Sequence, residues 1–102
     1  GMHLVVIVDE FSRYPIVEVT RSLSAQTIIP IFDRTFAMFG IPETLKSDNG
    51  PPFQSAEFAT FAKTLGFNHH RVTPRWPRAN EQVENFMNNL GKTIRAALTE
   101  KK

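Results

Sequence analysis

Residues 39–53 read F-G-I-P-E-T-L-K-S-D-N-G-P-P-F and carry the clearest structural signal in the chain. The short run Thr44 to Ser47 lies between Gly40 and Pro42 on one side and a Gly/Pro-rich turn on the other. A run bounded by such turn residues is typical of a short strand. The pattern therefore predicts a strand that delivers Asp48 to the point where the chain turns.

A second informative acid is Glu84, in P-R-A-N-E-Q-V-E-N-F-M-N-N-L, where a loop leads into an amphipathic helix; 35 residues separate it from Asp48. An acid at a strand end and an acid on a helix can converge on a divalent cation, because hard cations such as Mg²⁺ prefer carboxylate oxygens. Two such ions can hold the attacking and leaving oxygens of a phosphoryl transfer.

Each of these acids also has a simpler structural interpretation. Asp before Asn-Gly favours a turn through its own side chain, which alone would account for Asp48. An acid in the first turn of a helix is stabilised by the helix dipole, which alone would account for Glu84. The two residue types by themselves leave both interpretations open.

Length and composition limit the class of protein. A chain of 102 residues with 41% hydrophobic residues and nine Phe predicts one small domain with a modest core. It contains no cysteine, which excludes disulfide and thiolate chemistry. No apolar run approaches the roughly 20 residues of a membrane span, and no signal peptide is evident, so we expect no membrane partner.

The charge is unevenly distributed. Residues 1–50 hold four basic and six acidic side chains, whereas residues 51–102 hold eight basic and four acidic ones. The second half, with a balance of +4, is therefore the half suited to a polyanion such as nucleic acid. Basic surfaces are common, so this signal is supporting only.

Hydrophobic periodicity and turn residues predict the remaining elements. In order these are a strand over 3–8, a strand over 16–20, a helix over 24–39, the strand over 44–47, a helix over 55–65, a strand over 68–73, a loop over 74–80 and a helix over 81–100. Within the last helix, an apolar side carries Val83, Phe86, Met87, Leu90, Ile94 and Ala97 or Leu98. Glu84, Asn88, Lys92 and Arg95 fall on a separate stripe.

Three stretches resemble a known family. They are V-V-I-V-D-E-F-S-R-Y-P, F-G-I-P-E-T-L-K-S-D-N-G-P-P-F and T-P-R-W-P-R-A-N-E-Q-V-E-N-F. Together with the 35-residue spacing they resemble the catalytic core of retroviral and retrotransposon integrases, most closely the gypsy type. That family carries an Asp-Asp-Glu triad, and the resemblance covers about residues 3–98, which we expect to form a single integrase core domain.

The resemblance implies an α/β fold, an RNase H-like mixed sheet flanked by helices. In the family, the first catalytic Asp lies on a strand just upstream of the 3–8 strand, in the middle of the sheet between that strand and the 44–47 strand. The chain begins at Gly1, so we expect this central strand to be missing. Asp9 does not match its position. An unpaired strand edge invites new pairing. We therefore expect dimerisation, exchange of an element between chains, or direct pairing of Val5–Val8 with Leu45–Ser47.

The resemblance also implies roles for individual residues. Asp48 and Glu84 would be catalytic and would bind Mg²⁺ or Mn²⁺. DNA would be bound by Asn49, Arg78, Asn80, Asn88, Lys92 and Arg95. For the three cationic side chains an ordinary solvated surface is the alternative. Trp76 could stack on bases, but packing of its loop is favoured.

The implied function is 3′-end processing and strand transfer on element ends and target DNA, by an intracellular, nuclear protein that forms a homodimer or a higher oligomer. Without the first Asp, we expect this chain to be inactive alone, so whether it is an enzyme stays open. The alternative is a catalytically dead, integrase-derived module for DNA binding or oligomerisation. A second alternative is a related DDE transposase or an RNase H-type nuclease, and the P-x-x-N-x-x-x-E loop argues against the nuclease.

Overall fold

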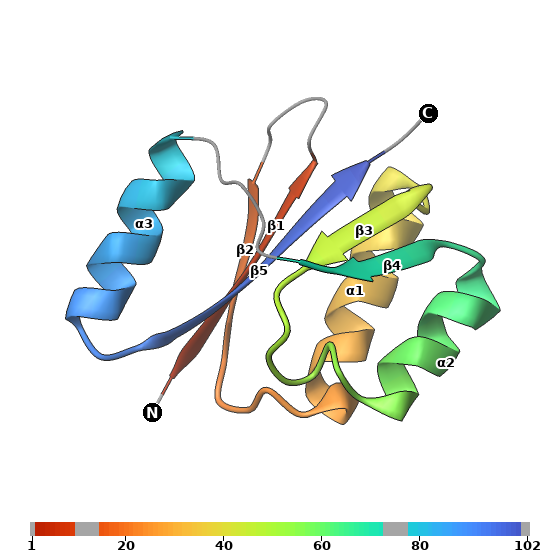
Figure 1. The fold of residues 1–102 in the computed structure, drawn as a ribbon, viewed down its shortest axis with the longest axis horizontal. Helices are drawn as coiled ribbons and strands as arrows, with labels where there is room; N and C mark the ends of the chain where they lie inside the picture. The colour runs from red at the N-terminus through yellow and green to blue at the C-terminus, as the bar shows by residue number, and fades with distance from the viewer. Residues whose placement is uncertain (1, 10–14, 73–77, 101–102) are drawn as a thin grey trace.

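The computed structural model describes residues 2–9, 15–72 and 78–100, with only the backbone described at 78–80 and 93 (Figure 1). Its elements, in chain order, are the strands β1 (His3–Asp9) and β2 (Pro15–Thr20), the helix α1 (Ala25–Phe39), the strand β3 (Thr44–Ser47), the helix α2 (Ala56–Leu65), the strand β4 (Asn68–Arg71), the helix α3 (Arg78–Asn89) and the strand β5 (Thr93–Glu100). The predicted elements are confirmed as far as β4, to within a few residues at their ends. Arg78 to Asn80, predicted as loop, belong to α3.

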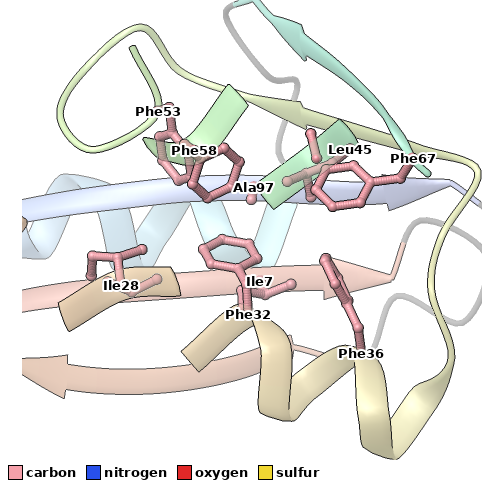
Figure 2. Close-up of a cluster of buried hydrophobic side chains, with 11 residues drawn as sticks. Ile7, Ile28, Phe32, Phe36, Leu45, Phe53, Phe58, Phe67 and Ala97 are labelled. Atoms are coloured by element: carbon pink, nitrogen blue, oxygen red, sulfur yellow. The ribbon is translucent and has the colours of Figure 1, made fainter. Parts of the chain in front are cut away.

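One face of the sheet carries the main core, which α1 and α2 cover (Figure 2). The core is built from aromatic rings packed edge to face. Phe32 of α1 contacts Phe53 and Phe58, with ring centroids 5.7 and 5.5 Å apart. Edge-to-face geometry is favourable because the positive ring edge meets the negative ring face. The two helices are therefore fixed to the sheet mainly by phenylalanine.

The periodicity of α1 predicts its buried face correctly except at its end. Ile28, Phe32 and Phe36 are at most 3% exposed, whereas Phe39, predicted on the same stripe, is 49% exposed. Pro30 lies on the exposed side of the helix without delaying its start. Gly40, with φ of 95°, ends the helix as predicted and donates its N–H to the Phe36 carbonyl.

The ends of α2 also follow the sequence. The Ser55 hydroxyl accepts a hydrogen bond from the backbone N–H of Phe58 at 3.1 Å, which satisfies one of the free donors of the first turn. Gly66 ends the helix in the left-handed region, at φ 82°. These caps fix where α2 begins and ends, between the turn that holds Asp48 and the strand β4.

The predicted helix over 81–100 is wrong beyond Asn89. α3 ends there, a turn follows in which Gly91 has φ of 71°, and residues 93–100 form β5. A left-handed conformation is inexpensive only for glycine, so Gly91 is where the helix can stop. The helical period of Ile94, Ala97 and Leu98 is overridden by tertiary pairing, which is the usual limit of propensity arguments.

β5 is the central strand of a five-stranded sheet with the order β2-β1-β5-β3-β4. It pairs in parallel with β1, from His3 with Thr93 to Asp9 with Thr99, and antiparallel with β3, from Thr44 with Glu100 to Ser47 with Ala97. It therefore occupies the position between β1 and β3 that the family resemblance assigns to the missing strand.

Direct pairing of β1 with β3, one of the three expected ways of completing the sheet, is wrong, whereas dimerisation and exchange of an element between chains stay predictions. β1 does not pair directly with β3, and the segment inserted between them belongs to the same chain. An upstream strand joined to β1 by a short turn would run antiparallel to it, because parallel neighbours need a long crossover. β5 runs parallel to β1, so it fills this position in the reverse direction. Backbone groups that the missing strand would leave unpaired are thereby satisfied.

The opposite face of the sheet holds a smaller apolar cluster, in which Val6, Val8 and Leu98 are buried. α3 lies on the other side of the strands from α1 and α2 (Figure 1). Its apolar side chains are largely in solvent, with Val83 39% and Phe86 62% exposed. Among the described residues, no helix combines the length and apolar character that crossing a bilayer requires.

The aromatic core gives a matched test of the fold. We expect Phe32→Ala to lower the free energy of unfolding by about 3–5 kcal/mol, because it removes a fully buried ring and leaves a cavity. Phe39→Ala, on the same helix but half exposed, should cost less than about 1 kcal/mol. Urea denaturation followed by circular dichroism measures both, and equal losses would contradict this packing.

Candidate functional site

Asp48 follows β3 at the turn that the sequence predicts, and its side chain is about one quarter exposed. Its Oδ1 accepts a hydrogen bond from the backbone N–H of Gly50 at 2.9 Å. This is the side-chain-to-backbone bond typical of Asp in a turn, so the turn interpretation is confirmed. It leaves Oδ2 as the oxygen free to face another group.

That group is Arg95, on β5. Its Nη1 lies 3.6 Å from Asp48 Oδ2, and its Nε donates a hydrogen bond to the Pro51 carbonyl at 3.0 Å. The guanidinium lies directly over Gly50, where a Cβ would overlap Arg95 Cζ. A side chain at position 50 would therefore require the end of the Arg95 side chain to shift. Arg95, which comes from the central strand, therefore packs over the turn that carries Asp48.

The position of Arg95 follows from strand register. Arg95 pairs with Val5 of β1, and Ala97, two residues later, pairs with Ile7 and with Ser47. Since alternate residues of a strand share a face, Arg95 and the buried Ala97 point to the same side of the sheet. Arg95 consequently lies just beyond the end of β3, on the side of the main core. The prediction that it shares a helical stripe with Glu84 is wrong, because residue 95 is not helical.

A second polar contact lies next to Asp48. Ser47 is fully buried, and its hydroxyl lies 2.7 Å from His69 Nε2 of β4. The His69 ring packs on Phe58, with centroids 4.8 Å apart. Burial lowers the pKa of His69 to about 4, and the neighbouring Arg71 and His70 act in the same direction. His69 is therefore neutral near pH 7.

The other predicted site residues are spread over the molecule. Glu84 is half-buried on α3, across the sheet from α1 and α2, and Asn88 is exposed on the same helix. Lys92 is exposed just before β5, and Asn49 is exposed in the turn after β3. Arg78 and Asn80 lie in the first turn of α3, with side chains outside the described part. Trp76 is outside the described residues altogether. The roles of all these residues stay predictions.

The described residues do not form a site that fits two metal ions. One oxygen of Asp48 is held by the turn and the other faces a guanidinium, which already supplies positive charge. Within residues 2–9, 15–72 and 78–100, no three His, Asp or Glu side chains lie together as a metal-binding group. A divalent cation needs several oxygens with few competing charges. In this arrangement the nearest charged partner of Asp48 is the Arg95 guanidinium, 3.6 Å from Oδ2.

Sequence reasoning missed two contacts here. Neither the Ser47–His69 hydrogen bond nor the Arg95–Asp48 pair has a local signature, because the partners are 22 and 47 positions apart in the sequence. The first had a weak signal: His69 and His70 are adjacent in a strand, so one of them had to face the core. The second had none, since it depends on residues 93–100 being a strand.

Comparison of the sequence with known proteins identifies the family. Residues 1–77 match the model of the family described as the integrase core domain. The chain belongs to the integrase core family. A Pol polyprotein of Feline endogenous virus ECE1 is 35% identical over 98 residues, which are 95% of this chain and 9% of that protein. An uncharacterized protein of Caenorhabditis elegans is 37% identical over 94 residues, which are 92% of this chain and 7% of that protein.

Solved structures of integrase cores are also similar. The HTLV-2 integrase catalytic core domain in complex with magnesium, in its dimeric form, matches with a TM-score of 0.61 and 28% identity, over 81% of this chain and 55% of that one. Its trimeric form matches with a TM-score of 0.60. The integrase core therefore has the α/β, RNase H-like architecture that the resemblance implied. This chain spans less than a tenth of the two relatives named above and about half of the solved core.

The half-buried His69 leads us to predict a loss of stability in acid. The pKa of His69 is lower in the folded protein than in the unfolded chain, so the unfolded chain binds an extra proton between about pH 6.5 and 4. The free energy of unfolding should therefore fall by on the order of 1–2 kcal/mol as pH drops through this interval. His69→Gln should flatten this part of the profile, and His70→Gln, at a position nearer the surface, should not. A profile that His69→Gln leaves unchanged would contradict the assignment.

Proposed function

We propose that this chain is the part of a retroelement integrase core that supplies Asp48 and Glu84, and that the longer polypeptide carries out 3′-end processing and strand transfer on DNA. The observation that supports this most directly is Asp48, held in a D-N-G turn at the end of β3 in an integrase core sheet. In such chemistry water or a 3′-hydroxyl attacks a DNA phosphate, and acids at this place bind the metal ions that stabilise the developing charge.

We propose Mg²⁺ or Mn²⁺ as the cofactor of the assembled enzyme. The similar HTLV-2 core was solved with magnesium, which makes divalent metal a property of the family. Asp48 and Glu84 are the carboxylates of this chain that would contribute ligands. Their present surroundings do not assemble such a site, so the isolated chain should not join DNA. The enzyme would need the strand and the acid that the family carries upstream of β1.

DNA is the proposed partner, and the nucleus the proposed location. Lys92 is an exposed cation at the entrance to β5, the strand that carries Arg95, and Asn49 is exposed within the Asp48 turn. Contacts from such side chains to phosphates position DNA without reading its sequence. Arg78, Asn80 and Asn88 would extend this surface along α3. The dimeric and trimeric forms of the HTLV-2 core favour self-association of this chain as well.

A non-enzymatic DNA-binding or oligomerisation module is the second candidate. The contact that favours it is the Arg95–Asp48 pair, because a carboxylate paired with a guanidinium is not available to a metal ion. The gene sequence upstream of His3 distinguishes the two. A strand there that carries Asp favours the enzyme, and its absence favours the module.

Binding of a short DNA duplex tests the part of the proposal that this chain can carry alone. Lys92→Ala should weaken binding and reduce the slope of log affinity against log salt concentration by about one, because one phosphate contact and its counterion are lost. Lys63→Ala removes the same charge from the last turn of α2 and should leave the slope unchanged. Fluorescence anisotropy at several salt concentrations measures both. Identical slopes for the two variants, or no binding by the parent chain, would contradict the proposal.

A further inference from the structure

We propose that Asn49 is a deamidation site, and that the side chain of Asp48 protects it by holding the backbone N–H of Gly50. Deamidation here is the spontaneous conversion of the Asn49 side-chain amide to an acid, with water as the co-reactant. Neither metal binding nor DNA binding is needed for this reaction, so it goes beyond the proposed function.

The sequence makes Asn49 the most reactive asparagine of the chain. Of the six asparagines, at positions 49, 68, 80, 85, 88 and 89, only Asn49 is followed by glycine. The reaction begins when the backbone nitrogen of the following residue attacks the side-chain carbonyl. Glycine has no Cβ and the widest conformational freedom, so its nitrogen reaches that carbonyl with the least hindrance.

The reaction has two balanced steps. In the first, the Gly50 nitrogen bonds to Asn49 Cγ, the Cγ–Nδ2 bond breaks, and the amide group leaves as ammonia with the proton that the Gly50 nitrogen loses. In the second, water opens the five-membered imide at either of its carbonyls. The product is aspartate or isoaspartate at position 49, which adds one negative charge to a chain whose net charge is +2.

The surroundings of the Asn49 side chain leave it open to this chemistry. Asn49 is exposed in the turn after β3. Its amide group forms no hydrogen bond with any residue in the described part of the chain. Water can therefore reach the side chain and ammonia can leave, so solvent access does not limit the reaction.

The hydrogen bond between Gly50 and Asp48 opposes ring closure. The Gly50 N–H donates to Asp48 Oδ1 at 2.9 Å. The imide nitrogen carries no hydrogen, so every route to the imide gives up this bond. Hydrogen bonds to a charged acceptor are among the stronger ones in proteins. Asp48 therefore stabilises the intact turn and cannot stabilise the ring-closed intermediate in the same way.

Two further contacts hold the backbone on either side of the Gly50 nitrogen. The Gly50 carbonyl accepts a hydrogen bond from the Phe53 N–H at 2.9 Å. The Arg95 guanidinium covers Gly50 and donates to the Pro51 carbonyl at 3.0 Å. Ring closure moves the Gly50 nitrogen toward Asn49 Cγ, so it requires local opening of this turn. The fold thus slows a reaction that the local sequence favours.

Deamidation would alter the turn that carries Asp48. The isoaspartate product adds a methylene group to the main chain between Asp48 and Gly50, which changes the spacing on which their hydrogen bond depends. Both products place a second carboxylate next to Asp48, and like charges at this distance repel each other. Modified chains should therefore hold the turn less firmly than the parent chain does.

Peptide mass spectrometry of the chain incubated in mildly alkaline buffer tests the protection. Asp48→Ala removes the acceptor and should deamidate at Asn49 about tenfold faster than the parent, the factor that corresponds to one hydrogen bond to a charged group. Asp48→Asn keeps an acceptor oxygen and should react more slowly than Asp48→Ala. Asp33→Ala is the matched control, because it removes the same charge from an exposed position of α1 and should leave the rate unchanged.

The same measurement in urea separates the effect of the turn from that of the sequence. In the unfolded chain the Gly50 N–H has no fixed partner, so the parent and Asp48→Ala should deamidate at similar rates. The parent should also react faster in urea than when folded. Circular dichroism shows whether each variant is folded without urea. If Asp48→Ala does not fold, the parent in the two conditions and the folded Asp48→Asn variant still test the proposal.

Three results would overturn the proposal. Absence of deamidation at Asn49 in urea would show that it is not a modification site. Equal rates for the folded and the unfolded parent would contradict protection by the turn. A rate in folded Asp48→Ala that is equal to or below that of the parent would contradict the role of Asp48. The assay contains no DNA and no metal ion, so its failure leaves the proposed function standing, and a failed DNA-binding experiment leaves this result standing.

Discussion

The pairing of β5 with both β1 and β3 is the interaction on which the rest of the structure depends. β1 and β3 are buried strands, and a buried backbone N–H or carbonyl without a partner costs a large part of a hydrogen bond. Without a strand between them, the sheet would be divided and the aromatic core that α1 and α2 form over it would be divided too. Residues 93–100 satisfy this demand although their composition favours a helix.

The surroundings of Asp48 follow from the use of residues 93–100 as the central strand. Register puts Arg95 beyond the end of β3, beside the turn that holds Asp48, and puts Ala97 in the main core. The same choice shortens α3 and leaves Phe86 and Leu90 in solvent. The chain thus has the sheet and turn of an integrase core, but Asp48, the proposed metal ligand, faces Arg95. The proposed inactivity of the isolated chain and the exposure of α3 have a common cause.

Much of this was accessible from the sequence. Caps and turn residues predicted α1, β3 and α2, since Ser55, Gly40 and Gly66 act locally, and the helical period predicted Phe32 and Phe36 as core. The position of Asp48 followed from the D-N-G stretch, and the family followed from that stretch together with the P-x-x-N-x-x-x-E loop and the 35-residue spacing. The strand conformation of residues 93–100 could not be predicted, because it depends on their pairing with β1 and β3 and not on their own sequence pattern. The Arg95–Asp48 and Ser47–His69 contacts were inaccessible for a related reason, as each joins segments far apart in the chain.

The conformation of Ala96 and Ala97 tests the central claim most directly. Both alanines are buried in β5, between β1 and β3, and alanine Cα chemical shifts differ in sign between strand and helix relative to an unfolded chain. In the protein labelled with ¹³C-alanine, we predict strand-type Cα shifts at both positions, with amide contacts from Ala97 to both β1 and β3 in nuclear Overhauser spectra. Helix-type shifts at Ala96 and Ala97, without these contacts, would contradict the account.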